Sequence, residues 1–260
     1  MFVSGLELWQ WVNQAKIDAI ASEIPQVELD WLLQELAGLD KLALRLESFK
    51  DLPKVQLKLS VSELDRLWQR RLQERVPVQY LTGVAHWRDF SLKVTPAVLI
   101  PRPETELLID LAVDAHAVDC SSEALAVARL NAENLGFGSR INFYQGLWWQ
   151  PLEFLKGKVS GMVSNPPYIP SSTVLTLQPE VLKHEPHLAL DGGLDGLDCI
   201  RHLVETAPDY LESGGVWLVE MMAGQETAVA DMLQSHGSYG EVQIFSDLAG
   251  IDRFALAYRL

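Results

Sequence analysis

Four consecutive residues, Asn165-Pro166-Pro167-Tyr168, follow a short apolar segment and combine an amide, two rigid rings and an aromatic ring. A residue before proline is restricted to extended backbone, so Asn165 cannot begin a helix and its side chain faces the crevice at the end of the strand. The Asn165 side-chain oxygen and the Pro166 carbonyl then offer two neighbouring acceptors to a planar NH2 group. Tyr168 can stack on the plane of that group. The pattern predicts a clamp for a planar amino group, and a rigid turn with a buried tyrosine is the alternative.

A second candidate is Asp119, which ends the expected strand 117–119 just before a helix capped by Ser121 or Ser122. In doubly wound sheets, ligands lie in the crevice at the carboxyl ends of the strands, where an acid can accept both hydroxyls of a ribose. A helix-capping or solvated aspartate is the equal alternative. His184 and His187 have the spacing of metal ligands, but no third ligand is evident, so we do not expect a metal site.

The elements that position these residues alternate along residues 96–260. We expect strands at 117–119, 141–144, 159–163, 216–220, 242–245 and 254–258, and helices at 121–135, 199–211 and 225–233. A turn at Gly214-Gly215 precedes the fourth strand. The alternation predicts a doubly wound α/β fold with a mostly parallel sheet and helices on both faces.

Residues 1–76 have a different pattern, typical of a small helical bundle. Two segments, Ser4-x-x-Glu7 and Ser60-x-x-Glu63, have the spacing of capping boxes, and each opens a stripe of leucine and tryptophan residues. We interpret the stripes as the core of the bundle, an interpretation compatible with a surface that binds another protein. A β-hairpin is expected at 84–94, within a linker at 77–95.

The composition restricts the classes of function. The 260 residues carry a net charge of −14, which disfavours binding to phosphate backbones. Two cysteines, the lack of a signal-peptide pattern at the start and the lack of a long uncharged apolar run lead us to expect a cytoplasmic protein that binds no membrane.

Several longer motifs give the chain a family resemblance. Its sequence resembles the release factor glutamine methyltransferases, a branch of the class I S-adenosylmethionine-dependent methyltransferases, almost from end to end. The segments that carry the resemblance are VTPAVLIPRPETELLID (94–110), AVD (117–119), NPPYI (165–169), EPHLALDGGLDGL (185–197), LESGGVWLVE (211–220) and DLAGIDR (247–253). The resemblance implies a helical N-terminal domain (1–76) that binds release factor, joined by the hairpin to a Rossmann-like methyltransferase domain (96–260).

The resemblance also implies roles for single residues. Asp119 matches the acid that binds the cofactor ribose, and Trp148 matches an aromatic beside the adenine. The family often has an acid directly before this tryptophan, where the present chain has Leu147. The NPPY residues (Asn165, Pro166, Pro167 and Tyr168) match the glutamine clamp, and Asn165 also borders the cofactor methyl group. The implied substrate is the glutamine of the Gly-Gly-Gln loop in bacterial class I peptide chain release factors, which act in translation termination. We expect the enzyme to work as a monomer.

The chain departs from the family pattern between Asp110 and Asp119, where only LAVDAHAV is present. Family members have there a complete strand and a glycine-rich loop that cradles S-adenosylmethionine, so roughly thirty residues are absent, judged by the length of a βα unit. The absent strand would be the central one, and its neighbours would be left with unpaired edges. We therefore expect the natural gene product to contain this segment; a genuine deletion that leaves a defective relative is the alternative.

Two other functions are compatible with the same motifs. A nucleic-acid amino-methyltransferase also presents a planar NH2 group to an NPPY loop, on a flipped base, but the net charge of −14 and the lack of a basic stripe oppose it. A release-factor binder without catalytic activity is favoured by the missing glycine-rich loop and opposed by the intact NPPY motif and Asp119.

Overall fold

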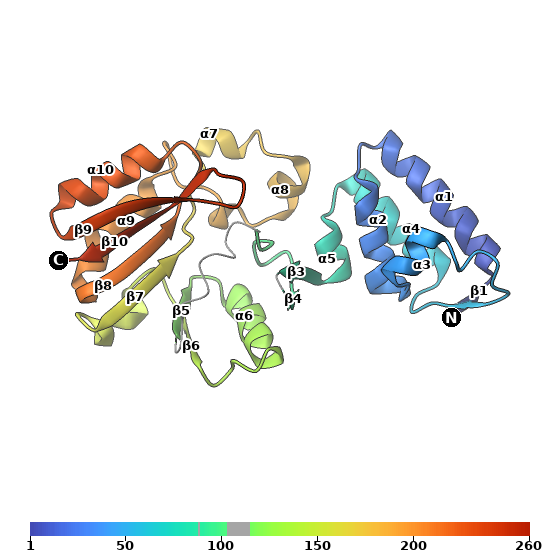
Figure 1. Cartoon of the computed structure of the whole chain (residues 1–260), viewed down its shortest axis with the longest axis horizontal. Helices are drawn as coiled ribbons and strands as arrows, with labels where there is room; N and C mark the ends of the chain where they lie inside the picture. Colours follow the sequence, from blue (N-terminus) through green and yellow to red (C-terminus); the bar gives the residue numbers. More distant parts are fainter. Residues whose placement is uncertain (88, 103–114) are drawn as a thin grey trace. The chain divides into compact units, whose positions relative to one another are not determined.

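The computed structural model describes residues 1–87, 89–102 and 115–260, and it divides into two units, Met1–Val84 and Ala85–Leu260 (Figure 1). The first unit is helical and the second contains a β-sheet with helices. Each is described by itself. In the described ranges, no helix combines the length and the hydrophobicity that a bilayer crossing requires.

The helical unit contains five α-helices and one small pair of strands among its described residues. They are α1 (Gly5–Ala21), α2 (Gln26–Leu32, followed by a π-helical turn at Leu33–Ala37), α3 (Lys41–Leu46), α4 (Val61–Gln69, followed by a π-helical turn at Arg70–Glu74), α5 (Val78–Thr82), and β1 (Phe2–Val3) antiparallel to β2 (Val55–Gln56). Its core is the predicted stripe of leucine and tryptophan side chains, of which Leu8, Leu29, Leu64 and Trp68 are completely buried.

The helix starts follow from local hydrogen bonding. The Ser60 side chain accepts from the backbone N–H of Glu63, and the Glu63 carboxylate accepts from the Ser60 N–H at 2.8 Å, so the predicted capping box is confirmed at α4. At α1 the Ser4 hydroxyl accepts from the Glu7 N–H at 3.2 Å and caps the helix.

The second unit contains the predicted alternation of strands and helices. Its elements are β3 (Val84–Trp87, which begins at the boundary), β4 (Phe90–Lys93), β5 (Ala115–Asp119), α6 (Ser122–Asn134), β6 (Ile141–Gln145), a 3-10 segment (Gln150–Leu155), β7 (Val159–Ser164), α7 (Ser171–Val174), α8 (Pro179–His184), α9 (Asp198–Thr206), β8 (Leu211–Glu220), α10 (Glu226–His236), β9 (Tyr239–Ser246) and β10 (Asp252–Arg259). Strands β3 and β4 pair as the expected hairpin. Residue 88, at the expected turn, lies outside the described residues.

The main sheet has the strand order β7-β8-β10-β9, and β5 pairs in parallel with β6 in a separate two-stranded sheet. Strand β7 is parallel to β8, whereas β10 is antiparallel to both β8 and β9. Among the described strands of this sheet, β7, β8 and β9 therefore run in one direction and β10 alone runs against them, so the expected mostly parallel sheet contains one antiparallel strand. The physical reason is the short connection between β9 and β10, because a parallel neighbour requires a crossover of about a dozen residues or more.

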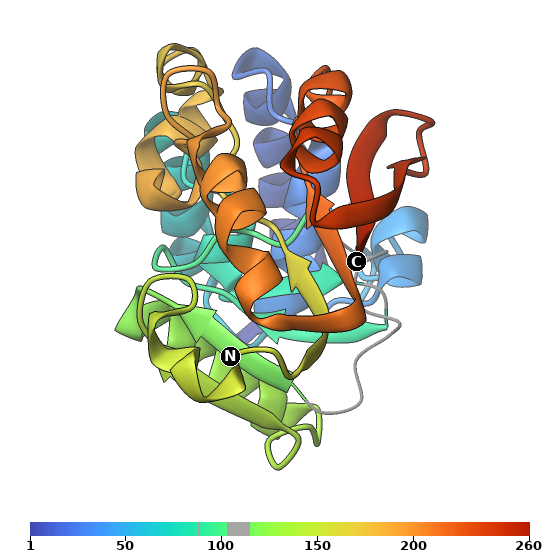
Figure 2. The same ribbon diagram turned by 90° about the vertical axis from the view of Figure 1, so that its left-hand side faces the viewer.

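One face of the main sheet is covered by α9 and α10, which lie side by side in Figure 2. The core between them is built on the buried side chains of Trp217, Ile200 and Leu233. Helix α9 ends at Thr206, earlier than expected, and a 3-10 turn at Ala207–Asp209 follows. Pro208 has no N–H with which to continue the helix.

The Gly214-Gly215 pair interrupts the pairing of β8 instead of preceding the strand. The register against β7 jumps from Val159–Leu211 to Gly161–Val216, so four residues of β8 form an excursion. Gly214 has φ +80°, and a Cβ on Gly215 would lie 2.9 Å from the Val159 carbonyl oxygen. Glycine is therefore required at both positions.

Strands β5 and β7, which would be the neighbours of the absent central strand in the sheet, are poorly covered. Among the described residues, β5 pairs only with β6 and β7 only with β8, and none of the residues of β5, β6 or β7 is fully buried. Val163, near the carboxyl end of β7, is 50% exposed. Such burial is unusual for inner strands of an α/β sheet, which are normally covered on both faces. The expected gap falls between Asp110 and Asp119, and residues 110–114 of that stretch lie outside the described residues.

Candidate active site

The Asn165-Pro166-Pro167-Tyr168 loop leaves the carboxyl end of β7, where the sequence predicts it. Asn165 is exposed and Pro166 is buried. Asn165 and Tyr168 line the same cavity of about 140 Å³, together with the Arg102 side chain. The rest of the described lining is apolar: Leu99, Ile169, Leu177, Val181, Ala189 and Leu190. A small cavity with an amide and an aromatic ring among apolar walls suits a short uncharged side chain.

Tyr168 is held at both ends of the residue. Its hydroxyl donates to Oε1 of Glu220 at 2.9 Å, and its carbonyl oxygen accepts from Nε2 of Gln225 at 3.1 Å. Burial, reinforced by the negative charge of Glu220, raises the pKa of Tyr168 well above its ordinary value. The hydroxyl therefore remains protonated at neutral pH and continues to donate to Glu220.

A glycine-rich segment, Asp191-Gly-Gly-Leu-Asp-Gly196, lies directly against the NPPY loop. The Ile169 N–H donates to the Leu190 carbonyl at 3.0 Å, and the Gly192 N–H donates to the Ile169 carbonyl at 2.8 Å. A Cβ on Gly192 would lie 2.8 Å from the Pro167 carbonyl oxygen, and one on Gly196 would collide with the Tyr168 carbonyl oxygen. The two loops approach so closely that only glycine fits at these positions.

Replacement of Gly196 by alanine is expected to cost about 2–4 kcal/mol of stability, from the left-handed backbone and the overpacking together. Gly237→Ala is the matched control, because Gly237 has φ +77° against +78° for Gly196 and has no atom within 4 Å of an added Cβ. The control is expected to lose only about 1–2 kcal/mol. Urea unfolding of both variants measures the difference. Equal losses of stability in the two variants would show that the NPPY loop and the glycine-rich segment can move apart at little energetic cost.

The wall beside Asn165 contains an ion pair whose carboxylate is buried. Nη2 of Arg102 lies 2.7 and 2.8 Å from the two carboxylate oxygens of Glu185, whose side chain is 2% exposed. The Arg102 carbonyl accepts from Nε1 of Trp87 at 3.1 Å. Because the Arg102 side chain is 33% exposed, only loss of Arg102 would leave a charge unpaired and shielded from water, that of the Glu185 carboxylate. The two bonds fix the position of Arg102 at the cavity.

Asp119 is the last residue of β5, and its side chain is exposed. Its Oδ1 accepts from the Ser121 N–H at 2.7 Å, and the Ser121 hydroxyl caps α6 by accepting from the Ala124 N–H. The Asp119 carbonyl accepts from the Gly146 N–H at 3.1 Å. This last bond joins the end of β5 to the loop after β6, which carries Trp148.

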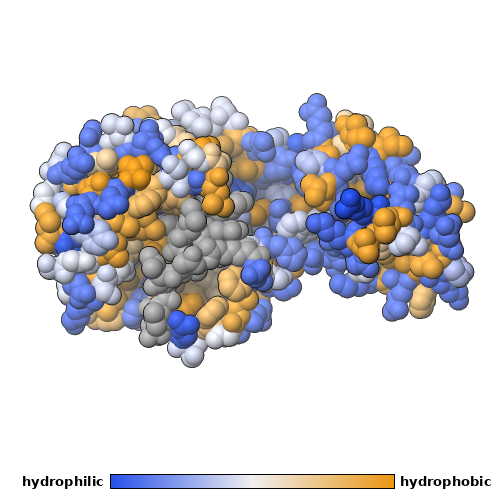
Figure 3. Space-filling model, viewed as in Figure 1, coloured by the Kyte–Doolittle hydropathy of each residue, from blue (hydrophilic) through white to orange (hydrophobic). Residues whose placement is uncertain are grey.

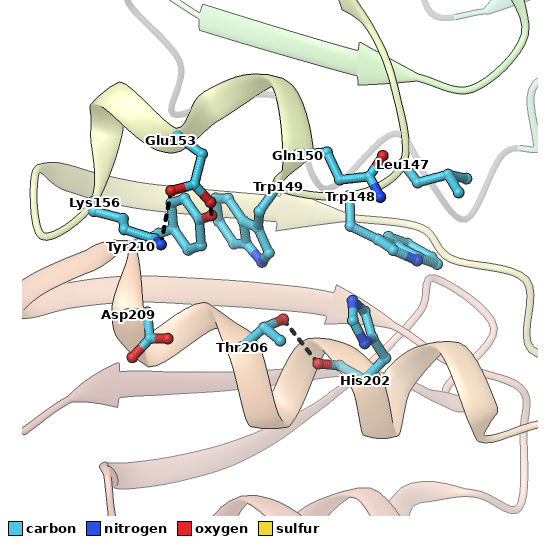
Figure 4. Close-up of a pocket in the computed structure, with 10 residues that line it drawn as sticks. All are labelled: Leu147, Trp148, Trp149, Gln150, Glu153, Lys156, His202, Thr206, Asp209 and Tyr210. Carbon is cyan, nitrogen blue, oxygen red and sulfur yellow. Dashed lines mark hydrogen bonds and ion pairs between the residues drawn. The ribbon is translucent and has the colours of Figure 1, made fainter.

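Trp148 lines a second cavity of about 270 Å³, shown in Figure 4. Its backbone is held at φ +53°, an uncommon conformation for a residue with a side chain. The indole faces the His202 ring of α9, with 5.7 Å between the ring centroids. Leu147 stands where the family often has an acid and is 50% exposed. The acids of this cavity, Glu153 and Asp209, lie at its far end near Tyr210 (Figure 4).

The structure thus brings the predicted residues together in two groups. Asn165 and Tyr168 share one cavity, while Asp119 ends β5 and is joined by a hydrogen bond to the loop that carries Trp148. Neither Asp119 nor Trp148 is among the described residues that line the cavity of Asn165. Sequence reasoning assigned no role to Glu220 or Gln225. Glu220 carries a signal that could have revealed it, because it ends an apolar strand, VWLVE, as Asp119 ends β5.

Comparison with known proteins gives the class of the protein. A family model described as the PrmC N-terminal domain matches residues 7–83, and a model described as an RMKL-like methyltransferase domain matches residues 84–175. With the α/β fold of the second unit, these matches define an S-adenosylmethionine-dependent methyltransferase with a helical N-terminal domain.

Full-length relatives are more specific. A release factor glutamine methyltransferase from Synechocystis sp. is 48% identical over 295 residues, covering 100% of this chain and 98% of the relative. One from Thermosynechococcus vestitus is 47% identical over 282 residues, covering 96% of each chain, and one from Gloeobacter violaceus is 39% identical over 280 residues, covering 95% of this chain. The chain belongs to the release factor glutamine methyltransferase family.

The same comparison bears on the predicted gap. The alignment with the Synechocystis relative has 295 positions, whereas this chain has 260 residues, so at least 35 aligned positions have no counterpart here. This number agrees with the roughly thirty residues expected to be absent from one βα unit.

The residues present fit the adenosine end of S-adenosylmethionine. Asp119 offers an exposed carboxylate at the carboxyl end of a strand, and Trp148 offers an aromatic face on the adjoining loop. The chain has no glycine between Gly83 and Gly136, so no glycine-rich loop precedes Asp119.

Proposed function

We propose that this chain methylates the side-chain amide nitrogen of the glutamine in the Gly-Gly-Gln motif of bacterial class I peptide chain release factors. The observation that carries the proposal is the shared cavity of Asn165 and Tyr168, which places an amide and an aromatic ring around a space of about 140 Å³. Family membership supports the same substrate, since the relatives are named release factor glutamine methyltransferases.

The chain's own residues act on the amide by positioning. A carboxamide nitrogen is a poor nucleophile because its lone pair is delocalised. The Asn165 side-chain oxygen and the Pro166 carbonyl accept its two hydrogens, which favours negative charge on the nitrogen, while Tyr168 fixes its plane. The amide nitrogen gives up one of its N–H protons to water when it takes the methyl group.

S-adenosylmethionine, when bound, supplies the electrophilic methyl group. Asp119 would hold the ribose hydroxyls, Trp148 would pack beside the adenine, and Asn165 would border the methyl group. Leu147 contributes no acid to the adenine, so Trp148 is the main contact that this loop offers.

The helical unit, predicted at 1–76, serves in this proposal to bind the release factor. Large apolar side chains are exposed on it: Phe2, Leu6, Ile17, Ile20, Val27, Leu42, Leu46 and Leu52. Orange, hydrophobic areas are visible on this unit in the face that Figure 3 shows. Exposed apolar groups of this kind suit a protein partner, and the net charge of −14 disfavours nucleic acid and anionic membranes. We place the enzyme in the cytoplasm as a monomer.

The test is transfer of a labelled methyl group to purified release factor. Wild-type release factor is expected to gain one methyl group on its glutamine, and a Gly-Gly-Ala variant none, as read by peptide mass spectrometry. Methylation of DNA or RNA instead would favour the nucleic-acid alternative. Binding of release factor without transfer would favour the non-catalytic binder, a reading that the missing glycine-rich loop supports.

A further inference from the structure

We propose that Gln225 and Glu220 are positioning residues, which hold Tyr168 in place against the substrate amide from two sides. The inference rests on the proposed function, in which Tyr168 stacks on the glutamine carboxamide. Neither residue lines the Asn165 cavity among its described residues, so both act through Tyr168.

Gln225 links three segments that are distant in sequence. It immediately precedes α10, its side chain is buried, and its Nε2 donates to the carbonyl oxygens of Tyr168 at 3.1 Å and Gly196 at 3.3 Å. Its Oε1 accepts from the Met222 N–H at 2.9 Å. One amide group therefore joins the NPPY loop, the glycine-rich loop and the turn after β8. Because the site is buried, loss of these donors would leave two carbonyl groups without solvent to replace them.

Glu220 fixes the other end of Tyr168. It is the last residue of β8, is 1% exposed and accepts from the Tyr168 hydroxyl at 2.9 Å. The Tyr168 carbonyl is hydrogen-bonded to Gln225 and its hydroxyl to Glu220. The Tyr168 ring therefore cannot change its direction without breaking a buried hydrogen bond. A ring held in this way loses little conformational freedom when a planar amide stacks on it.

The decisive variants change Gln225 without changing its size. Gln225→Glu replaces the two-hydrogen donor by an acceptor, so a carboxylate oxygen faces two carbonyl oxygens. Gln225→Met keeps the volume without charge and remains informative if the glutamate variant does not fold. The matched control is Gln243→Glu, which makes the same charge change at an exposed position of β9 in the same sheet. For Glu220, Gln is the conservative replacement that keeps an acceptor oxygen, and Leu removes it.

The experiment measures calorimetric binding of two peptides to the full chain, one containing Gly-Gly-Gln and one containing Gly-Gly-Ala. We expect wild type, Gln243→Glu and Glu220→Gln to prefer the glutamine peptide. In Gln225→Glu, Gln225→Met and Glu220→Leu we expect at least tenfold weaker binding of that peptide and loss of the preference. Circular dichroism checks that each variant is folded at the temperature of measurement.

The outcomes separate the two proposals. If wild type does not distinguish the peptides, the amide clamp itself is wrong and the proposed function fails. If wild type distinguishes them and folded Gln225→Met binds the glutamine peptide with unchanged affinity, the proposed function stands and the positioning role is overturned.

Discussion

Asn165→Ala is expected to lower turnover on release factor at least about 100-fold while changing the dissociation constant for S-adenosylmethionine less than about threefold. Removal of one preorganised hydrogen-bonding group that acts mainly in the transition state typically costs about 10²–10³ in rate. Asn165 accepts a hydrogen of the reacting amide in the proposed function, whereas Asp119 and Trp148 hold the cofactor. Single-turnover kinetics and calorimetry measure the two quantities.

Asn142→Ala is the matched control for this substitution, because Asn142 is an exposed asparagine on β6 in the same unit. It is expected to retain full turnover. Equal losses of turnover and cofactor affinity in Asn165→Ala would contradict the clamp and would assign Asn165 mainly to cofactor binding.

Insertion of the corresponding segment of the Synechocystis relative between Asp110 and Asp119 is expected to raise Tm by about 10 °C. The reason is the incomplete cover of β5 and β7, of which no residue is fully buried. A central strand would complete the burial of several partly exposed side chains on these strands, such as Val163 and Val118, where burial of one valine from full exposure is worth about 1.5–3 kcal/mol. For a protein of this size, about 4 kcal/mol corresponds to a shift of roughly 8–16 °C. Differential scanning calorimetry measures it.

A glycine-serine insert of the same length is the control, since it lengthens the loop without supplying a strand or the cofactor-binding loop of the family segment. It is expected to leave Tm unchanged or lower. The family segment should also tighten binding of S-adenosylmethionine at least tenfold, because it supplies the missing glycine-rich loop. Unchanged Tm and cofactor affinity after insertion would show that this chain has replaced the central strand by other means.

Local sequence chemistry determined much of the fold and part of the site. Ser60 and Glu63 start α4 with two hydrogen bonds that involve only neighbours, and Ser121 caps α6 with one such bond. Asp119 and Asn165 lie at strand ends because hydrophobic runs stop there and a proline or a helix cap follows. Such features depend on residues within a few positions, so the sequence alone was enough to predict them.

Tertiary structure alone decided how Tyr168 is held and how the sheet is completed. Glu220 and Gln225 reach Tyr168 across more than fifty residues of sequence, and Gly196 reaches it across 28. No local pattern encodes which carbonyl a buried amide will meet. The position of β10, antiparallel between β8 and β9, is also decided by tertiary structure, because packing and the lengths of the connections determine which strands are neighbours. Composition and spacing identify the groups capable of chemistry, whereas long-range packing determines which of them are fixed in place.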